Sequence, residues 1–167
     1  MTIHIIIAGD EATRCAKIEE FLHILVRRDS LPLDIIVHSA TYTDPFDNLD
    51  EIIRTMGQPE WSRPCIIALD IKYPTLPYGG ITVVYDELVR NFAPDPIPAK
   101  FIVWYSVYLA EPGEDRDKVL AMAASRGVNH TIHSGVADDL MAAAKYLLEL
   151  AKECAMPDDT DFLAGLA

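Results

Sequence analysis

Apolar and polar positions follow a pattern that repeats five times along the chain. In each repeat, a short apolar run precedes a stretch whose apolar residues recur every three or four positions, which is typical of a buried strand followed by an amphipathic helix. The predicted strands cover residues 3–8, 33–38, 65–69, 101–105 and 128–132. The predicted helices cover about residues 11–28, a short segment carrying Leu49, Ile52, Ile53 and Met56, a segment carrying Ile81, Val84, Tyr85 and Leu88, and about residues 115–126 and 136–154.

Strands that are apolar throughout, each followed by a helix, predict a parallel sheet covered by helices on both faces. The chain has neither a long linker nor an internal repeat, so we expect one domain over residues 1–155. The end of the chain, "MPDDTDFLAGLA", is acidic and broken by a proline, and residues 156–167 are expected to form a flexible tail. The fold class is therefore α/β, a doubly wound five-stranded parallel sheet of the (βα)5 flavodoxin-like type.

Charge and composition exclude several classes of function. The net charge of −12 repels phosphate backbones, so we expect no nucleic-acid binding by this chain. No apolar run approaches the roughly 20 residues that span a bilayer, and the N-terminus lacks the layout of a signal peptide. We therefore expect a soluble cytoplasmic protein without membrane contact. Cys15, Cys65 and Cys154 are too widely spaced for a zinc pattern or a disulfide framework, which indicates reduced thiols.

Polar residues follow the ends of the predicted strands, where doubly wound folds place their sites. Asp10 and Glu11 follow the first strand, Asp70 the third and Ser106 the fourth. Acids gathered at one sheet edge repel each other, so a carboxyl group binds a proton or a cation neutralises the group. Mg²⁺ binds one or two carboxylates together with phosphate oxygens, and an aspartate beside it can accept a phosphoryl group.

This interpretation makes Asp70 a candidate phosphoryl acceptor, with Ser106 as a hydrogen-bond donor to a phosphoryl oxygen. A structural interpretation of the same residues also stands. Asp10 and Glu11 suit the first turn of a helix, where negative charge favours the helix dipole, and Asp70 could cap the following loop.

The residues quoted so far resemble the receiver domain of two-component response regulators, over about residues 2–154. The resemblance implies the strand order 2-1-3-4-5. It also implies phosphorylation on Asp70 and a Mg²⁺ site made by Asp10, Glu11, Asp70 and the backbone carbonyl of Lys72. Asp10 matches the acid that ligates the metal directly, whereas Gly9 stands where the family usually has another acid, for which Glu11 partly substitutes.

Further positions match the family in the loops that follow strands three and four. Pro74 matches the proline four residues after the phosphorylated aspartate. Gly80 resembles the glycine that opens the third helix, displaced by an insertion in "TLPYGG". Ser106 matches the hydroxyl residue that moves on activation.

The chain departs from the family after the fifth strand. The family has a lysine there, but counting from Gly127 places Ser134 at that position, which offers a hydrogen bond and no charge. His133 could supply a pH-dependent charge instead. Thr131 stands where the family has its aromatic switch residue, a role that Tyr105 or Tyr108 could take. The resemblance is thus to an atypical receiver, with Ser106, Ser134 and Thr131 as the switch and phosphate-contact positions.

Two interpretations of function follow from the resemblance. In the first, a histidine kinase or phosphotransfer protein phosphorylates Asp70, and the phosphoryl group switches an interaction face for a downstream effector protein or a homodimer. In the second, the chain is a pseudo-receiver that docks or dimerises without phosphorylation, which Gly9 and the missing lysine favour. A phosphatase of the haloacid-dehalogenase type needs an aspartate and a threonine where Lys72 and Pro74 stand. We therefore expect no enzyme activity beyond self-phosphorylation.

Overall fold

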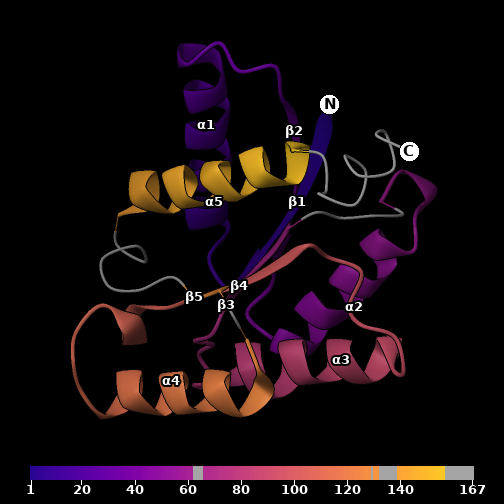
Figure 1. Ribbon diagram of the computed structural model, residues 1–167. Helices are drawn as coiled ribbons and strands as arrows, with labels where there is room; N and C mark the ends of the chain where they lie inside the picture. Colours follow the sequence, from indigo (N-terminus) through magenta and orange to yellow (C-terminus); the bar gives the residue numbers. More distant parts are fainter. Residues whose placement is uncertain (62–65, 129, 132–138, 157–167) are drawn as a thin grey trace, which may run out of the picture.

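The computed structural model describes residues 1–61, 66–128, 130–131 and 139–156. Its long helices alternate with strands in the order expected from the sequence (Figure 1). The strands are β1 (Thr2–Gly9), β2 (Asp34–Thr41), β3 (Ile66–Asp70), β4 (Phe101–Tyr105) and β5 (His130–Thr131). The α-helices are α1 (Ala12–Arg28), α2 (Pro45–Met56), α3 (Asp86–Phe92), α4 (Glu114–Arg126) and α5 (Leu140–Ala155). Shorter helical turns are η1 (Pro59–Trp61), η2 (Gly80–Tyr85) and η3 (Val107–Leu109).

The strands form one parallel sheet, and the order 2-1-3-4 of the first four strands confirms the doubly wound arrangement. At the outer edge, the two residues of β5 pair in parallel with Val103 and Trp104 of β4. The strand expected over 128–132 is thus described only at its centre, with Val128 outside it. No helix in the described part of the chain is long and apolar enough to cross a membrane.

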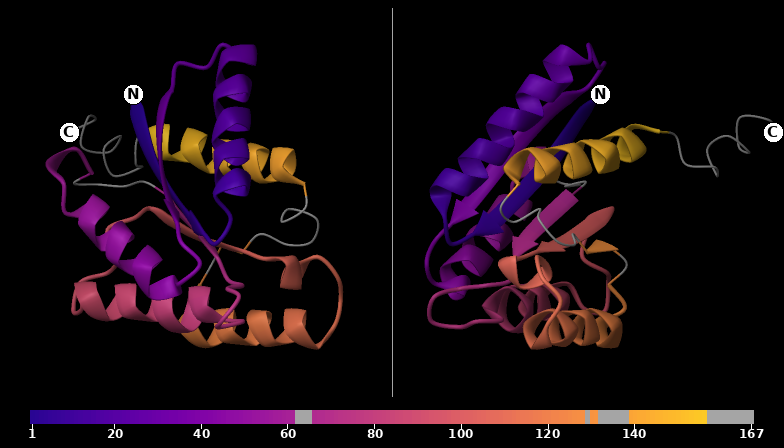
Figure 2. Two further views of the ribbon diagram at one scale, coloured as in Figure 1. Left: turned by 180° about the vertical axis from the view of Figure 1, so that it is seen from behind. Right: turned by 90° about the vertical axis from the view of Figure 1, so that its left-hand side faces the viewer.

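Helices cover the sheet on both faces, and each face has its own core (Figures 1 and 2). Side chains of α1 and α5 pack against one face, and side chains of α2, η2, α3 and α4 pack against the other. Alternate residues of a strand point to opposite faces. In β3, therefore, Ile66 and Ala68 belong to the core beneath α1 and α5, whereas Ile67 and Leu69 belong to the other core.

Local signals in the sequence account for several helix ends. The Asp44 side chain accepts a hydrogen bond from the amide of Phe46 and caps α2, and Asp139 caps α5 in the same way through Ala142. Gly127 ends α4 in the left-handed conformation, with φ of 65°, which glycine adopts without a steric penalty. The third helical segment differs from a regular helix, because it begins with a π-helical turn at Gly80 and becomes α-helical only from Asp86.

Candidate functional site

The carboxyl ends of β1 and β3 border a pocket of about 280 Å³. The residues that line it come from the loop between β1 and α1, the first turn of α1, the last residue of β3 and the loop after β3. They are Asp10, Glu11, Arg14, Asp70, Lys72 and Pro74. The structure therefore brings together all four residues of the predicted metal site, and adds Arg14.

Asp70 is the last residue of β3 and is only 6% exposed. One of its carboxylate oxygens, Oδ1, accepts a hydrogen bond from the backbone amide of Lys72 at 3.2 Å. Burial and then the negative charge of Asp10 raise the pKa of the Asp70 carboxyl to about 7, against the smaller opposing effects of that hydrogen bond and of Arg14. Burial is thus the main reason that this carboxyl binds a proton up to near-neutral pH, and the charge of Asp10 adds to it.

The geometry around Gly9 leaves little room for a side chain at this position. A Cβ atom at this position would lie 3.2 Å from the Tyr105 hydroxyl oxygen and 3.3 Å from Cβ of Asp70, tighter than most real contacts. Tyr105 is buried, and its hydroxyl donates a hydrogen bond to the carbonyl oxygen of Ala8 at 3.1 Å. The tyrosine therefore takes up space that a side chain at position 9 would need.

Arg14 was missed in the sequence analysis. It lies in the first turn of α1, which begins at Ala12, and its side chain lines the pocket together with Asp10 of the preceding loop. Its side chain is 21% exposed, and its Nε atom lies 3.9 Å from a carboxylate oxygen of Glu11. In the sequence, the only sign of this role is a basic residue in the first turn of the helix that follows the acids. An arginine at such a position is equally typical of an exposed helix surface.

A buried asparagine, also missed, ties three segments together behind the pocket. Asn48 of α2 is fully buried, and its amide nitrogen donates to the carbonyl oxygen of Gly9 at 2.8 Å and to the hydroxyl of Tyr73. Its side-chain oxygen accepts from the amide of Tyr42 at 2.8 Å. The end of β1, the loop after β2 and the loop after β3 are therefore held at fixed distances from one another.

Gly80, the first residue of η2, lies very close to the backbone of Asp70 and Ile71, as expected of the glycine that opens the third helical segment. A Cβ atom there would lie 1.9 Å from the backbone oxygen of Asp70 and 2.6 Å from Cα of Ile71. The amide of Gly80 donates to the carbonyl oxygen of Ile71 at 3.0 Å. Because only glycine fits this approach, η2 packs directly against the backbone of the candidate phosphoryl acceptor.

Ser106 lies immediately after β4 and is buried, but it is not among the residues that line the pocket. Its hydroxyl oxygen accepts a hydrogen bond from the amide of Tyr108 at 3.2 Å, within its own loop. The Tyr108 ring in turn lies 5.7 Å from Nζ of Lys72 and 5.2 Å from the ring of Tyr78. Ser134, His133 and the side chain of Thr131 lie outside the described residues.

The pocket offers a divalent cation carboxylate oxygens, but fewer than a site made by three acidic side chains would. Among the described residues, no group of three or more histidine, cysteine, aspartate or glutamate side chains is arranged to hold a metal ion. Glu11 is 57% exposed and lies beside Arg14, which leaves Asp10 and Asp70 as the carboxylates closest to a shared site. Two carboxylates completed by water and phosphate oxygens suit Mg²⁺, so the residues present fit the ion.

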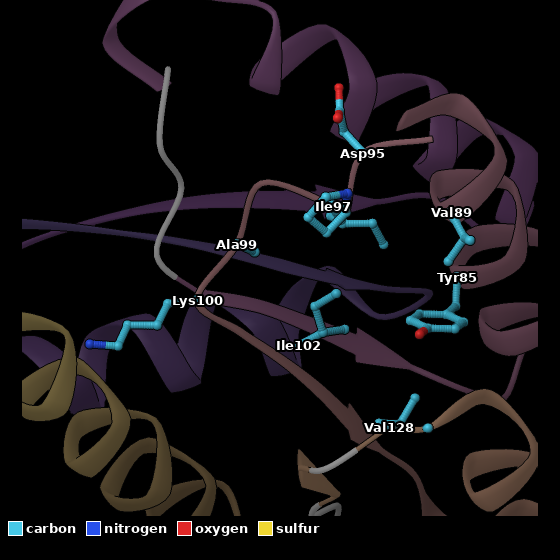
Figure 3. Close-up of a pocket in the computed structure, with 10 residues that line it drawn as sticks. Tyr85, Val89, Asp95, Ile97, Ala99, Lys100, Ile102 and Val128 are labelled. Atoms are coloured by element: carbon cyan, nitrogen blue, oxygen red, sulfur yellow. The ribbon is translucent and has the colours of Figure 1, made fainter. Parts of the chain in front are cut away.

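A second pocket, of about 370 Å³, lies at the opposite ends of the strands, where the chain enters β4 and β5 (Figure 3). Its centre is lined by Tyr85, Ile97 and Ile102, while the side chains of Asp95 and Lys100 point away from it. Lys100 instead donates a hydrogen bond to a backbone carbonyl of α5. Among the residues that line this second pocket, no acidic side chain points into it. The candidate functional site is therefore the pocket at the carboxyl ends of the strands.

The chain is similar to a solved response regulator. The structure superposes on the Mn²⁺-bound form of the response regulator Rcp1 with a TM-score of 0.52, at 19% sequence identity, covering 87% of this chain and 91% of that one. No protein-family model and no curated protein sequence matches the chain. At this level of identity the similarity establishes the fold, which the sequence had predicted. The chain therefore has the fold of a response-regulator receiver domain.

Proposed function

We propose that this chain is a signalling receiver that accepts a phosphoryl group on Asp70. The observation that carries the proposal is the position of Asp70. It is a buried carboxylate at the end of the central strand β3, it faces a pocket that also holds Asp10, and the sheet around it has the receiver fold. A buried acid with uncompensated negative charge beside it is an unfavourable arrangement, and such arrangements are common at functional sites.

The chemistry is a displacement at phosphorus. An oxygen of the Asp70 carboxylate attacks the phosphorus atom of a phosphohistidine on the donor protein. The O–P bond forms as the P–N bond breaks, and the bonding electron pair goes to the leaving imidazole, which takes up a proton. Only the ionised carboxyl is a nucleophile, so in the absence of a cation the raised pKa of Asp70 would disfavour this attack below neutral pH.

A divalent cation would assist this reaction, and the similar response regulator was solved with Mn²⁺. In this chain Asp10, Asp70 and the backbone carbonyl of Lys72 would hold Mg²⁺, with Glu11 as an outer carboxylate. When bound, the ion would neutralise the carboxylates and the oxygens of the transferred group.

The signal would leave the pocket through the loop after β4. Phosphorylation adds nearly two negative charges beside a buried core. Ser106 is held within this loop by its hydrogen bond to Tyr108, whose ring lies near Lys72 of the pocket. We propose that rearrangement of this loop changes the face of α4, β5 and α5, and that a cytoplasmic effector protein or a second copy of the chain binds there. A histidine kinase or phosphotransfer protein would be the donor.

A phosphorylation-independent docking module is the second candidate, and the space around Gly9 favours it. The family acid at this position is absent, and Tyr105 and Asp70 leave little room for a side chain there. If the remaining carboxylates bind no cation, the same fold serves as an interaction module alone.

Mass spectrometry after incubation with Mg²⁺ and acetyl phosphate separates the two candidates. We expect a single phosphoryl adduct on the wild-type protein and none on Asp70→Asn. The variant Asp50→Asn, which changes an exposed carboxylate on α2, is the matched control and should keep the adduct. Absence of the adduct from the wild type, with a melting temperature that Mg²⁺ does not change, would leave the docking module as the function.

A further inference from the structure

Two cations, Arg14 and Lys72, line the pocket together with its three acids. The Nζ atom of Lys72 lies 5.7 Å from the centre of the Tyr108 ring, where the ring face attracts it. Arg14 has a different setting. It forms an ion pair with Glu11, and its guanidinium makes no hydrogen bond to another residue in the described part of the chain. Arg14 therefore keeps N–H donors for a ligand.

We propose that Arg14 binds the phosphoryl oxygens in this pocket and supplies the positive charge that the family takes from a lysine after the fifth strand. This inference rests on the proposed function and deepens it, because it names the residue that recognises the transferred group. The ligand chemistry is a tetrahedral phosphate oxyanion, whether covalently attached to Asp70 or free in solution.

The position of Arg14 on the fold supports this role. Alternation along β3 points Asp70 toward the face of the sheet that α1 and α5 cover, since Ile66 and Ala68 belong to that core. Cys15, the residue after Arg14, is buried in the same core next to Tyr105. The first turn of α1 thus lies near the carboxyl ends of β3 and β4, and Arg14 lines the same pocket as Asp70.

The ion pair with Glu11 leaves Arg14 available. The distance of 3.9 Å is long for an ion pair, and Glu11 is largely exposed, so the interaction is weak and screened by solvent. A guanidinium group has five N–H donors in a planar fork that matches two phosphate oxygens at once. Arg14 can therefore bind a phosphoryl group without giving up a strong contact.

The charges in the pocket also require such a residue. Three acids and two bases line it, so the bases do not outnumber the ionised acids, and a phosphoryl group adds nearly two further negative charges. Arg14 is partly buried, where the effective dielectric is lower than in water and an attraction of opposite charges is stronger. Arg14 already acts on Asp70 in this sense, because its charge opposes the rise in the pKa of that carboxyl.

The first test compares the rate of adduct formation from acetyl phosphate and Mg²⁺ in three variants. Arg14→Ala should slow the reaction about ten- to hundredfold, the usual effect of losing a charge-assisted hydrogen bond, and Arg14→Lys should fall between it and the wild type. Arg27→Ala is the matched control, since Arg27 is exposed in the last turn of the same helix, and should react at the wild-type rate. Equal rates in Arg14→Ala and the wild type would overturn the proposal.

The second test uses Asp70→Asn, which cannot be phosphorylated, and inorganic phosphate as the probe. We expect phosphate to shift the NMR signals of the pocket amides saturably in Asp70→Asn, and in the double variant with Arg27→Ala. The double variant with Arg14→Ala should show no saturable shift while its other amide signals stay in place, which shows that it is folded. A phosphate response that survives the loss of Arg14 would refute the proposal.

The two tests also separate this inference from the proposed function. A wild-type protein that never carries an adduct, together with phosphate binding to Asp70→Asn that requires Arg14, would refute phosphorylation and support Arg14 as an oxyanion site. A wild-type protein that is phosphorylated at the same rate with and without Arg14 would support the function and refute the role of Arg14.

Discussion

Removing the charge of the buried Asp70 carboxyl, by the substitution Asp70→Asn, should increase the free energy of unfolding. Below the ordinary pKa of 3.8, this carboxyl is protonated in both the folded and the unfolded chain. Between 3.8 and about 7 the folded chain keeps the proton while the unfolded chain loses it, so the folded state binds more protons and stability falls as the pH rises. Above about 7 the loss is complete and constant.

The size of the effect follows from the two pKa values. Their difference is about 3, and each unit corresponds to about 1.36 kcal/mol, which gives a penalty of about 4 kcal/mol at alkaline pH. Asp70→Asn removes the charge, and the side-chain oxygen of asparagine can still accept the hydrogen bond from Lys72. The stability gained by this substitution should therefore increase by about 3 kcal/mol between about pH 4.5 and about pH 8.

Denaturant unfolding of both proteins at a series of pH values, with divalent cations chelated, measures this gain. The exposed Asp50→Asn serves as the control and should alter stability by no more than about 0.5 kcal/mol at any pH. If Asp70→Asn is no more stable than the wild type at about pH 8, or if its advantage is the same at every pH, the account of charge and burial in this pocket is wrong.

Three substitutions test the packing around the pocket by denaturant unfolding. Gly80→Ala should cost more than about 3 kcal/mol, because its Cβ would lie 1.9 Å from a backbone oxygen, whereas Gly113→Ala, which meets nothing within 4 Å, should be close to neutral. Asn48→Ala should cost more than about 2 kcal/mol by leaving buried backbone groups unpaired, and the exposed Asn91→Ala should not. Gly9→Asp should destabilise by about 1–3 kcal/mol, since two side-chain atoms lie within 3.3 Å of its Cβ. A neutral Gly80→Ala, Asn48→Ala or Gly9→Asp would each contradict the packing described for that position.

Hydrophobic periodicity was sufficient to predict the order and type of the main elements. The strand before Asp70 was recognised because all its residues are buried on both faces, which produces a continuous apolar run. The position of Asp70 at the sheet edge followed from this, since the carboxyl ends of parallel strands meet there. The π-helical turn at Gly80 was not predictable in the same way, because the close backbone contact that it accompanies is between segments separated by a loop.

The roles of Arg14 and Asn48 could not be predicted from the sequence. Both are polar residues on helices whose apolar positions had already been assigned, and their roles depend on which strand ends lie beside them. The sequence shows that position 9 has no acid, but the limited space beside it depends on Tyr105, 96 residues away, which only the folded sheet brings close. Such pairings depend on tertiary contacts rather than on local patterns.

The hydrogen bond between Gly80 and Ile71 closes the loop after β3 at its base. Both ends of the loop are therefore fixed, one by the sheet and the other by the start of η2. Between these ends, the carbonyl oxygen of Tyr78 accepts hydrogen bonds from the amides of Ile81 and Thr82, and its hydroxyl donates to Asp115 of α4, so the exposed residues 74–77 are where the length of the loop can change with least effect on Asp70 and η2. A change in loop length at these exposed residues would therefore alter the outer edge of the pocket while the end of β3 and the start of η2 stay in place.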